Sequence, residues 1–96
     1  MQEKEVSLII PSYNNADELI GELPALLAYL KQSDYRVECW VVDDGSPSRG
    51  QLDAFCTREN IGLIIHDRNR GKGSAVRTGM LRATKPIRIF TDADIP

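Results

Sequence analysis

Short apolar runs alternate with amphipathic segments along this chain. Four runs, at residues 6–10, 37–42, 62–66 and 87–90, have the length and apolar content of buried strands. Between them, apolar residues recur at the three- and four-residue spacing of helices. The three predicted helices are marked by Leu19, Ile20, Leu23, Leu26, Leu27 and Leu30, by Leu52, Phe55 and Cys56, and by Ala75, Val76, Gly79, Met80 and Ala83.

Particular residue types mark the ends of these elements. Pro11 has no N–H to give to a sheet ladder, so we expect it to end the first strand. Asn14 and Asn15 are good helix-capping residues, and a helix is expected after them. Pro24 is expected to kink this helix or to start its second part. A helix over 51–59 and a helix opening at Gly71-Lys72-Gly73 complete the prediction.

This order of elements predicts an α/β fold, with a doubly wound, mainly parallel sheet of about four strands and three helices, because helices that join neighbouring parallel strands form right-handed crossovers. We expect a single domain over 1–96. Ligands of such sheets bind outside the carboxyl ends of the strands. A polar cluster follows each predicted strand, at residues 11–14, 43–46, 67–73 and 92–94. The four clusters together predict one binding site at this rim.

The distribution of charged residues along the chain is more informative than the overall composition. The 96 residues are 42% hydrophobic, which suits one small domain, and the net charge of -2 indicates no nucleic-acid partner. Seven of the 12 basic residues nevertheless fall within 68–88, where no acid occurs. Such a block is typical of a solvated helix face or, at its start, of an anion site.

The cysteines and the N-terminus indicate an intracellular protein. Cys39 and Cys56 lack the spacing of metal ligands, and Cys39 lies in an apolar run, so reduced core thiols are expected. The first residues form no signal-peptide core, and no segment approaches the roughly 18 apolar residues of a membrane span. The expectation is a soluble, cytoplasmic chain.

Asp92 and Asp94 are the candidate metal ligands. Side chains two residues apart on an extended chain point the same way, so the two carboxylates repel unless a cation joins them. Hard oxygen ligands suit Mg²⁺ or Mn²⁺ carrying substrate phosphates. A solvated acidic turn is the alternative interpretation of Asp-x-Asp alone; the three other clusters on the rim favour a metal site.

Residues 69–73 have the features of an anion site. Gly71 and Gly73 allow a close backbone approach, the helix N-terminus favours an anion, and Lys72 adds a positive charge. The alternative is a loop shaped by its glycines alone. The segment does not have the spacing of a nucleoside-triphosphate P-loop.

The remaining clusters suggest contacts with a nucleoside. One carboxylate of Asp43 and Asp44 could accept a hydrogen bond from a base or a ribose, and the other could cap the turn that follows, although a capping turn alone is possible. Tyr13 could lay its ring against a base, or could be half-buried packing. His66 has no nucleophile at a recognisable spacing, and we interpret it as packing or loop support.

These motifs, in this order, resemble the inverting glycosyltransferases of family 2, which have the GT-A fold. The resemblance rests on Ile10-Pro11-Ser12-Tyr13-Asn14, Val41-Val42-Asp43-Asp44-Gly45-Ser46, the run from Asn69 to Gly79, and Thr91-Asp92-Ala93-Asp94. The last two stretches are most similar to the branch that transfers glucose or mannose to polyprenyl or dolichyl phosphate.

The resemblance implies a role for each matched residue. Pro11 and Tyr13 would line the base pocket, and Asp44 would hold the base with Asp43 close by. Gly71 and Lys72 would approach the nucleotide side of the donor. In the last motif, Asp92 would contact the ribose or the metal, and Asp94 would bind the metal that bridges the diphosphate.

The chain also departs from the family pattern. Many relatives have Glu where this chain has Asn15, and the part of the family that carries the general base and the acceptor site has no counterpart here. We therefore expect donor and metal binding with little or no turnover. UDP-glucose is the favoured donor, a GDP-sugar is the alternative, and polyprenyl phosphate is the expected acceptor.

Two other functions stay open at this point. One is a nucleotidyltransferase-like or dinucleotide-binding enzyme, against which the absence of G-x-G-x-x-G after the first strand argues. The other is a non-catalytic interaction module. In any of these cases the strand at 87–90 could lie at an open sheet edge, which predicts association of two chains through it.

Overall fold

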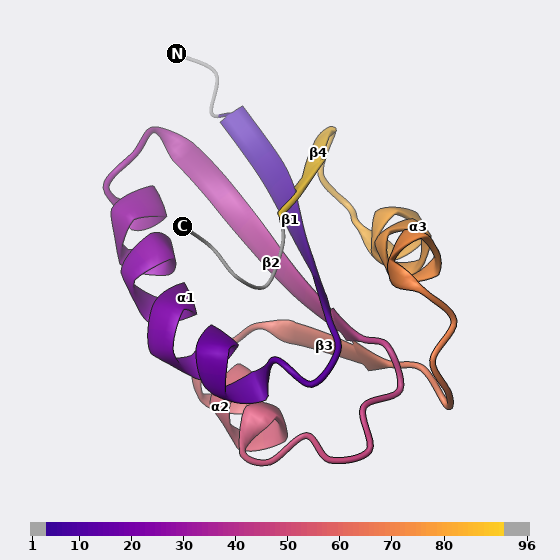
Figure 1. The fold of residues 1–96 in the computed structure, drawn as a ribbon. Coiled ribbons are helices and arrows are strands. Elements are labelled where there is room, and N and C mark those ends of the chain that lie inside the picture. The colour runs from indigo at the N-terminus through magenta and orange to yellow at the C-terminus, as the bar shows by residue number, and fades with distance from the viewer. Residues whose placement is uncertain (1–3, 92–96) are drawn as a thin grey trace.

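The computed structural model describes residues 4–91 and confirms the predicted α/β fold. The described residues form seven elements in the predicted order: β1 (Lys4–Ser12), α1 (Ala16–Lys31), β2 (Tyr35–Asp43), α2 (Leu52–Arg58), β3 (Gly62–Ile65), α3 (Lys72–Arg82) and β4 (Ile87–Phe90). The strands pair in parallel in the order β3-β2-β1-β4. Helices α1 and α2 cover one face of the sheet and α3 covers the other (Figure 1), so the sheet is doubly wound.

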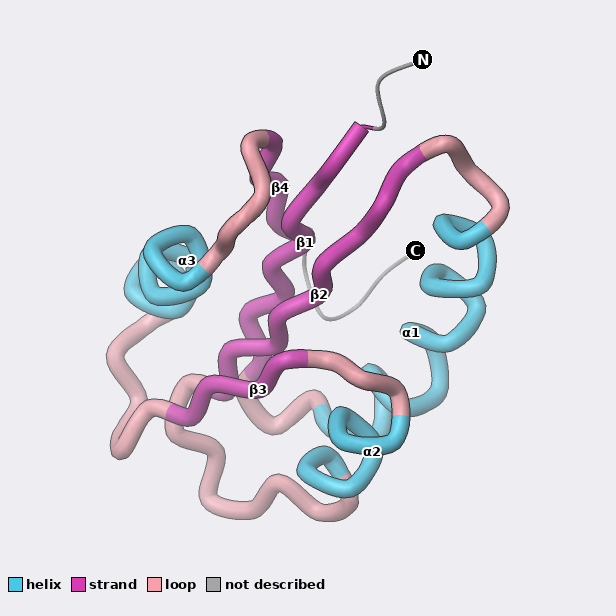
Figure 2. Tube along the Cα trace, turned by 180° about the vertical axis from the view of Figure 1, so that it is seen from behind, coloured by secondary structure: helices cyan, strands magenta, loops and turns pink. Residues whose placement is uncertain are grey.

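Alternation of side chains along β1 and β2 builds a core on each face of the sheet. Leu8 and Ile10 point to the α1 and α2 face, where they pack with Leu19, Leu23 and Phe55. On the α3 face, a smaller core contains Ile9, Val42, Ala75 and Ala83. Seen from behind in Figure 2, α3 stands apart from the other two helices, across the sheet. The buried β1 and β2 therefore serve as a rigid base for the loops at their carboxyl ends.

Helix α3 lies close to β1 because a glycine faces the strand. A Cβ atom built on Gly79 would lie 2.4 Å from Cγ2 of Ile9, closer than side chains approach one another. The glycine therefore sets the spacing between α3 and the sheet.

The expectation that Pro11 ends the first strand is wrong. The pairing of β1 with β2 continues through Pro11 and Ser12, opposite Val42 and Asp43. Backbone groups of alternate residues point to opposite sides of a strand, and the carbonyl of Ile9 faces β4, where it accepts a hydrogen bond from Thr91. Pro11 faces the same side, where the described register with β4 has already ended, so its missing N–H leaves the ladder with β2 intact.

The first helix also begins differently from the expected capping arrangement. Asn15 occupies the position before α1, but its side chain makes no capping hydrogen bond. Its Oδ1 atom instead accepts a hydrogen bond from the Tyr13 N–H at 3.0 Å. Pro24 lies inside α1, which is one continuous helix from Ala16 to Lys31.

Candidate functional site

The loops after β1, β2 and β3 are joined to one another at the carboxyl rim of the sheet. The Asp44 N–H donates to the Ser12 carbonyl at 2.8 Å, and the His66 N–H donates to the Asp43 carbonyl at 2.8 Å. The Asn14 N–H donates to Ser46 Oγ at 2.9 Å. In Figure 1 these loops gather at the lower end of the sheet. Three of the four predicted polar clusters therefore lie together, as expected from the parallel topology.

Asp43 organises the turn that follows β2. Its side chain is almost completely buried, with 1% of its surface exposed. One carboxylate oxygen accepts from the Ser46 N–H at 3.0 Å, and the other accepts from Ser46 Oγ at 2.6 Å. Because Ser46 Oγ in turn binds the Asn14 N–H, this carboxylate fixes the β2 turn against the β1 loop. One of the two adjacent acids thus caps the turn.

Asp44 performs the same task for the loop after β3. Its Oδ1 accepts from the Arg70 N–H at 2.9 Å and its Oδ2 accepts from the Gly71 N–H at 2.8 Å. Burial raises the pKa of the Asp44 carboxyl, but hydrogen bonds from His66 and from these two N–H groups outweigh it and lower that pKa below its ordinary value. Asp44 is therefore a buried carboxylate that holds the glycine loop. Its direct contact with a base stays a prediction.

His66 completes this arrangement, and the sequence pattern did not identify its partners. Its Nδ1 lies 2.8 Å from Asp44 Oδ1, and its Nε2 lies 2.8 Å from Thr78 Oγ1 on α3. The imidazole is 7% exposed. This geometry agrees with the expectation of loop support, but Thr78 was not predicted as a partner. The available clue was a polar residue directly before Gly79 in the otherwise small and apolar buried side of α3.

Two glycines adopt backbone conformations with positive φ in the loops at this rim. Gly45 has φ +75°, and a Cβ atom there would lie 2.3 Å from the Arg68 carbonyl carbon, so the β2 turn touches the backbone of the β3 loop. Gly71 has φ +96° and immediately precedes α3. Both conformations belong to the left-handed region that glycine adopts without strain. They place the N-terminus of α3, with its N–H groups, beside the loop that Asp44 holds.

The other predicted site residues differ in exposure. Tyr13 is 40% exposed at the end of β1, and Lys72 is exposed in the first turn of α3. Pro11 is buried, as is Ser12, whose Oγ has no hydrogen-bond partner among residues 4–91. Tyr13, Gly71 and Lys72 are thus the predicted residues that reach the surface at this rim, above the buried Asp43 and Asp44.

The predicted metal ligands, Asp92 and Asp94, lie outside the described residues. The chain leads toward the rim up to Thr91, whose N–H donates to the Ile9 carbonyl at 3.0 Å. Within residues 4–91, no group of three or more His, Cys, Asp or Glu side chains could hold a metal ion. The metal site at Asp92 and Asp94 stays a prediction.

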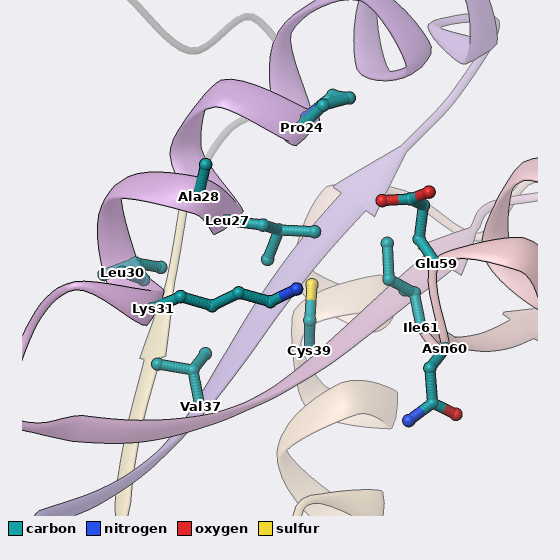
Figure 3. Close-up of a pocket in the computed structure, with 10 residues that line it drawn as sticks. All are labelled: Pro24, Leu27, Ala28, Leu30, Lys31, Val37, Cys39, Glu59, Asn60 and Ile61. Atoms are coloured by element: carbon teal, nitrogen blue, oxygen red, sulfur yellow. The ribbon is translucent and has the colours of Figure 1, made fainter.

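A separate pocket lies away from the rim, between α1, β2 and the turn after α2. Its volume is about 370 Å³, and Leu27, Cys39, Asn60 and Ile61 are among its lining residues. Figure 3 shows Lys31 extending across it toward the Cys39 sulfur. Burial raises the pKa of the Cys39 thiol to about 12, and the nearby Cys56 adds to the rise, so the thiol stays protonated and unreactive. The reduced core thiols expected from the sequence are confirmed.

No helix in the described part of the chain is long and apolar enough to cross a membrane.

Comparison with known proteins shows extensive similarity. Residues 7–95 match the family described as glycosyl transferase family 2. The chain is 33% identical to the dolichyl-phosphate beta-glucosyltransferase of Saccharomyces cerevisiae over 97% of its own length and 30% of that protein. It is 36% identical to the undecaprenyl-phosphate 4-deoxy-4-formamido-L-arabinose transferase of Photorhabdus laumondii, over 98% of the chain and 30% of the relative.

Solved structures show the same similarity in three dimensions. A mannosyltransferase from Pyrobaculum calidifontis, in complex with GDP-Man and Mn²⁺, superposes with a TM-score of 0.73 and 28% identity. The alignment covers 98% of this chain and 28% of that protein. Mannosyl-3-phosphoglycerate synthase from Rubrobacter xylanophilus, at 20% identity and a TM-score of 0.78, shares the fold. The chain thus spans less than a third of the length of these relatives.

Proposed function

Because the chain belongs to glycosyl transferase family 2, we propose that it forms the part of such an enzyme that binds the nucleotide-sugar donor. The observation that supports this most strongly is the glycine loop held by Asp44 at the N-terminus of α3. A fixed loop followed by a helix N-terminus is a favourable place for the diphosphate of a donor. The similar mannosyltransferase, solved with GDP-Man, supports the choice of ligand.

The exposed residues of the rim would contact the donor directly. We propose that Tyr13, together with the buried Pro11 two residues before it, lines the base pocket, and that Gly71 and Lys72 approach the phosphates. Asp44 holds the glycine loop through its N–H groups, and Asp43 holds the turn after β2, whose Ser46 hydroxyl binds the Asn14 N–H of the β1 loop. Asp44 is in addition proposed to approach the base. A rigid rim lowers the entropy cost of ordering loops when the ligand binds.

A divalent cation, Mg²⁺ or Mn²⁺, is proposed to bind at Asp92 and Asp94, with Asp92 also near the ribose. When bound, such a cation stabilises negative charge on the leaving nucleoside diphosphate. The Mn²⁺ in the similar mannosyltransferase structure supports a divalent metal.

The whole reaction is proposed from the relatives. We infer transfer of a hexose, with UDP-glucose favoured, to a polyprenyl phosphate by inversion, since the relatives are named for dolichyl and undecaprenyl phosphate. The site would then face the cytoplasmic side of a membrane. No residue of this chain is assigned as the general base, and residues 1–96 are proposed to supply donor and metal binding only.

A thermal-shift panel tests the proposal. The melting temperature of the chain should rise with UDP- or GDP-sugars, and rise further with Mn²⁺, because ligand that binds the folded state stabilises it. NAD and CTP serve as probes of the dinucleotide and nucleotidyltransferase alternatives. A rise with NAD or CTP alone would favour those enzymes, and no rise with any nucleotide would favour an interaction module.

A further inference from the structure

We infer that His66 is a positioning residue for the donor site, and that Thr78 orients it. The inference rests on the proposed function and adds two residues to it. His66 is the one histidine of the sequence and lies immediately after β3. Its two ring nitrogens join the loop after β2 to helix α3 through contacts of 2.8 Å on each side.

The hydrogen-bonding partners of His66 determine which ring nitrogen carries a proton. An ionised carboxylate only accepts hydrogen bonds, so the nitrogen beside Asp44 must carry a proton. In the neutral ring Nε2 is then an acceptor, and the Thr78 hydroxyl donates to it. In that form of the ring, Thr78 donates a hydrogen bond to His66, and His66 donates one to Asp44. Each group thereby holds the next in one orientation.

The last member of this chain acts on the backbone of the glycine loop. The Asp44 oxygen that faces His66 also accepts from the Arg70 N–H, and the second oxygen accepts from the Gly71 N–H. Rotation of the carboxylate would break these bonds and release the loop immediately before α3. His66 therefore acts on a bound diphosphate through Asp44 and the loop, without touching the ligand.

Variants of His66 and Thr78 test the inference in the 96-residue chain, with binding of UDP in the presence of Mn²⁺ as the measurement. His66→Gln removes the donor beside Asp44 and should weaken UDP binding about tenfold, comparable to the loss of one hydrogen bond to a charged group. His66→Asn keeps a donor at the Nδ1 position and should bind more tightly than His66→Gln. Thr78→Val should weaken binding by about threefold, whereas the matched Thr78→Ser, which keeps the hydroxyl, should bind as the unmodified chain does.

Affinities are measured by calorimetry at a temperature where thermal melts show each variant to be folded. A merely structural role would lower melting temperatures and leave the affinity of the folded chain unchanged, and that result would overturn the inference. If the unmodified chain did not bind UDP, the proposed function would fail, and the inference with it. Tighter binding by Thr78→Ser than by Thr78→Val would support it.

A spectroscopic measurement tests the bridge independently of any ligand. With ¹⁵N-labelled histidine the imidazole gives the signals of His66 alone, because the sequence has 1 histidine. The expected spectrum shows a proton on Nδ1, where the ring donates to Asp44. A ring protonated at Nε2 alone would overturn the inference, since it could not donate to Asp44.

Discussion

Single residues at the rim act mainly by fixing backbone. Asp43 and Asp44 are adjacent, yet each binds a different loop: Asp43 binds Ser46, and Asp44 binds the N–H groups of residues 70 and 71. Both carboxylates are nearly inaccessible to solvent. Their shared role explains how two acids can follow one buried strand without an exposed cluster of negative charge.

Gly45 offers a direct test of this packing between loops. Gly45→Ala should lower the free energy of unfolding by about 2 kcal/mol or more, because the left-handed backbone strains any side chain and the added Cβ would meet the Arg68 backbone. Urea denaturation of the two proteins measures the difference.

Gly21 supplies the matched control. It lies inside α1, and nothing lies within 4 Å of an added Cβ there. Gly21→Ala should raise the free energy of unfolding by up to about 1 kcal/mol, since alanine favours a helix. Equal unfolding midpoints for Gly45→Ala and the unmodified chain would contradict the described contact.

At this scale the sequence predicts which residues gather at the rim, but it does not predict their partners. Motif spacing placed Asp44 and Gly71 in the same site, because both follow strands of one parallel sheet. The bridge from Asp44 through His66 to Thr78 joins residues 22 and 12 positions apart. Such pairs depend on the three-dimensional packing of α3 on the sheet, which a pattern of polar and apolar positions does not specify.

Among the elements, the connection from α3 to β4 is held by one carboxylate on β2. Glu38 accepts hydrogen bonds from Ser7 Oγ at 2.7 Å and from the Thr84 hydroxyl and N–H at 2.8 and 3.0 Å. Ser7 Oγ in turn accepts from the Lys85 N–H at 3.1 Å. This cluster fixes the start of β4, the strand that leads to the predicted metal ligands.

The protonation of Glu38 should contribute to the acid stability of the chain. Partial burial raises the pKa of Glu38, but hydrogen bonds from Ser7 and Thr84 outweigh it and lower the pKa from 4.5 to about 2. A carboxyl whose pKa is lower in the folded state stabilises the fold above its unfolded pKa, and the contribution is lost as the pH falls through the folded pKa. The affected window is therefore from about 4.5 down to about 2.

Glu38→Gln should remove this contribution. Urea midpoints measured from pH 7 to pH 2.5 should fall less steeply for Glu38→Gln than for the unmodified chain, and the variant should be less stable at pH 7. Glu22→Gln, on the exposed side of α1, is the control and should follow the unmodified chain. Identical pH profiles for both variants would exclude the proposed role of Glu38.

Element types and order follow from the hydrophobic pattern, whereas their ends and neighbours depend on pairing. All seven elements were predicted, because short apolar runs and amphipathic helices leave distinct patterns. The extension of β1 past Pro11 was missed, because a proline is tolerated where one side of a strand has no partner. Likewise, the hydrophobic periodicity of the sequence does not indicate the order of the strands in the sheet, β3-β2-β1-β4.

Across the whole molecule, β4 is an edge of the described sheet with an apolar surface. Ile87, Ile89 and Phe90 are each about half exposed, and Ile87 and Ile89 line an apolar groove together with Val6, Leu8 and Leu30. An open edge with unpaired backbone groups and apolar side chains favours pairing with another strand.

Association through this edge is therefore expected for the 96-residue chain. Sedimentation velocity over a concentration series should show dimers or larger species, and Ile89→Lys should shift the population toward monomer. Leu81→Lys changes an equally apolar residue, 77% exposed on α3, and should have no such effect. A monomer at all concentrations would show that the edge does not associate.

Calorimetric titration with UDP determines whether this chain binds the nucleotide of a sugar donor together with a divalent metal. The unmodified chain should bind UDP more tightly with Mn²⁺ than without it, by about tenfold. Asp94→Ala should bind equally in both conditions, whereas Asp34→Ala, an exposed acid between α1 and β2, should behave as the unmodified chain. Binding that neither Mn²⁺ nor Asp94→Ala alters would exclude a metal site at Asp94, and no binding at all would exclude a donor site in this chain.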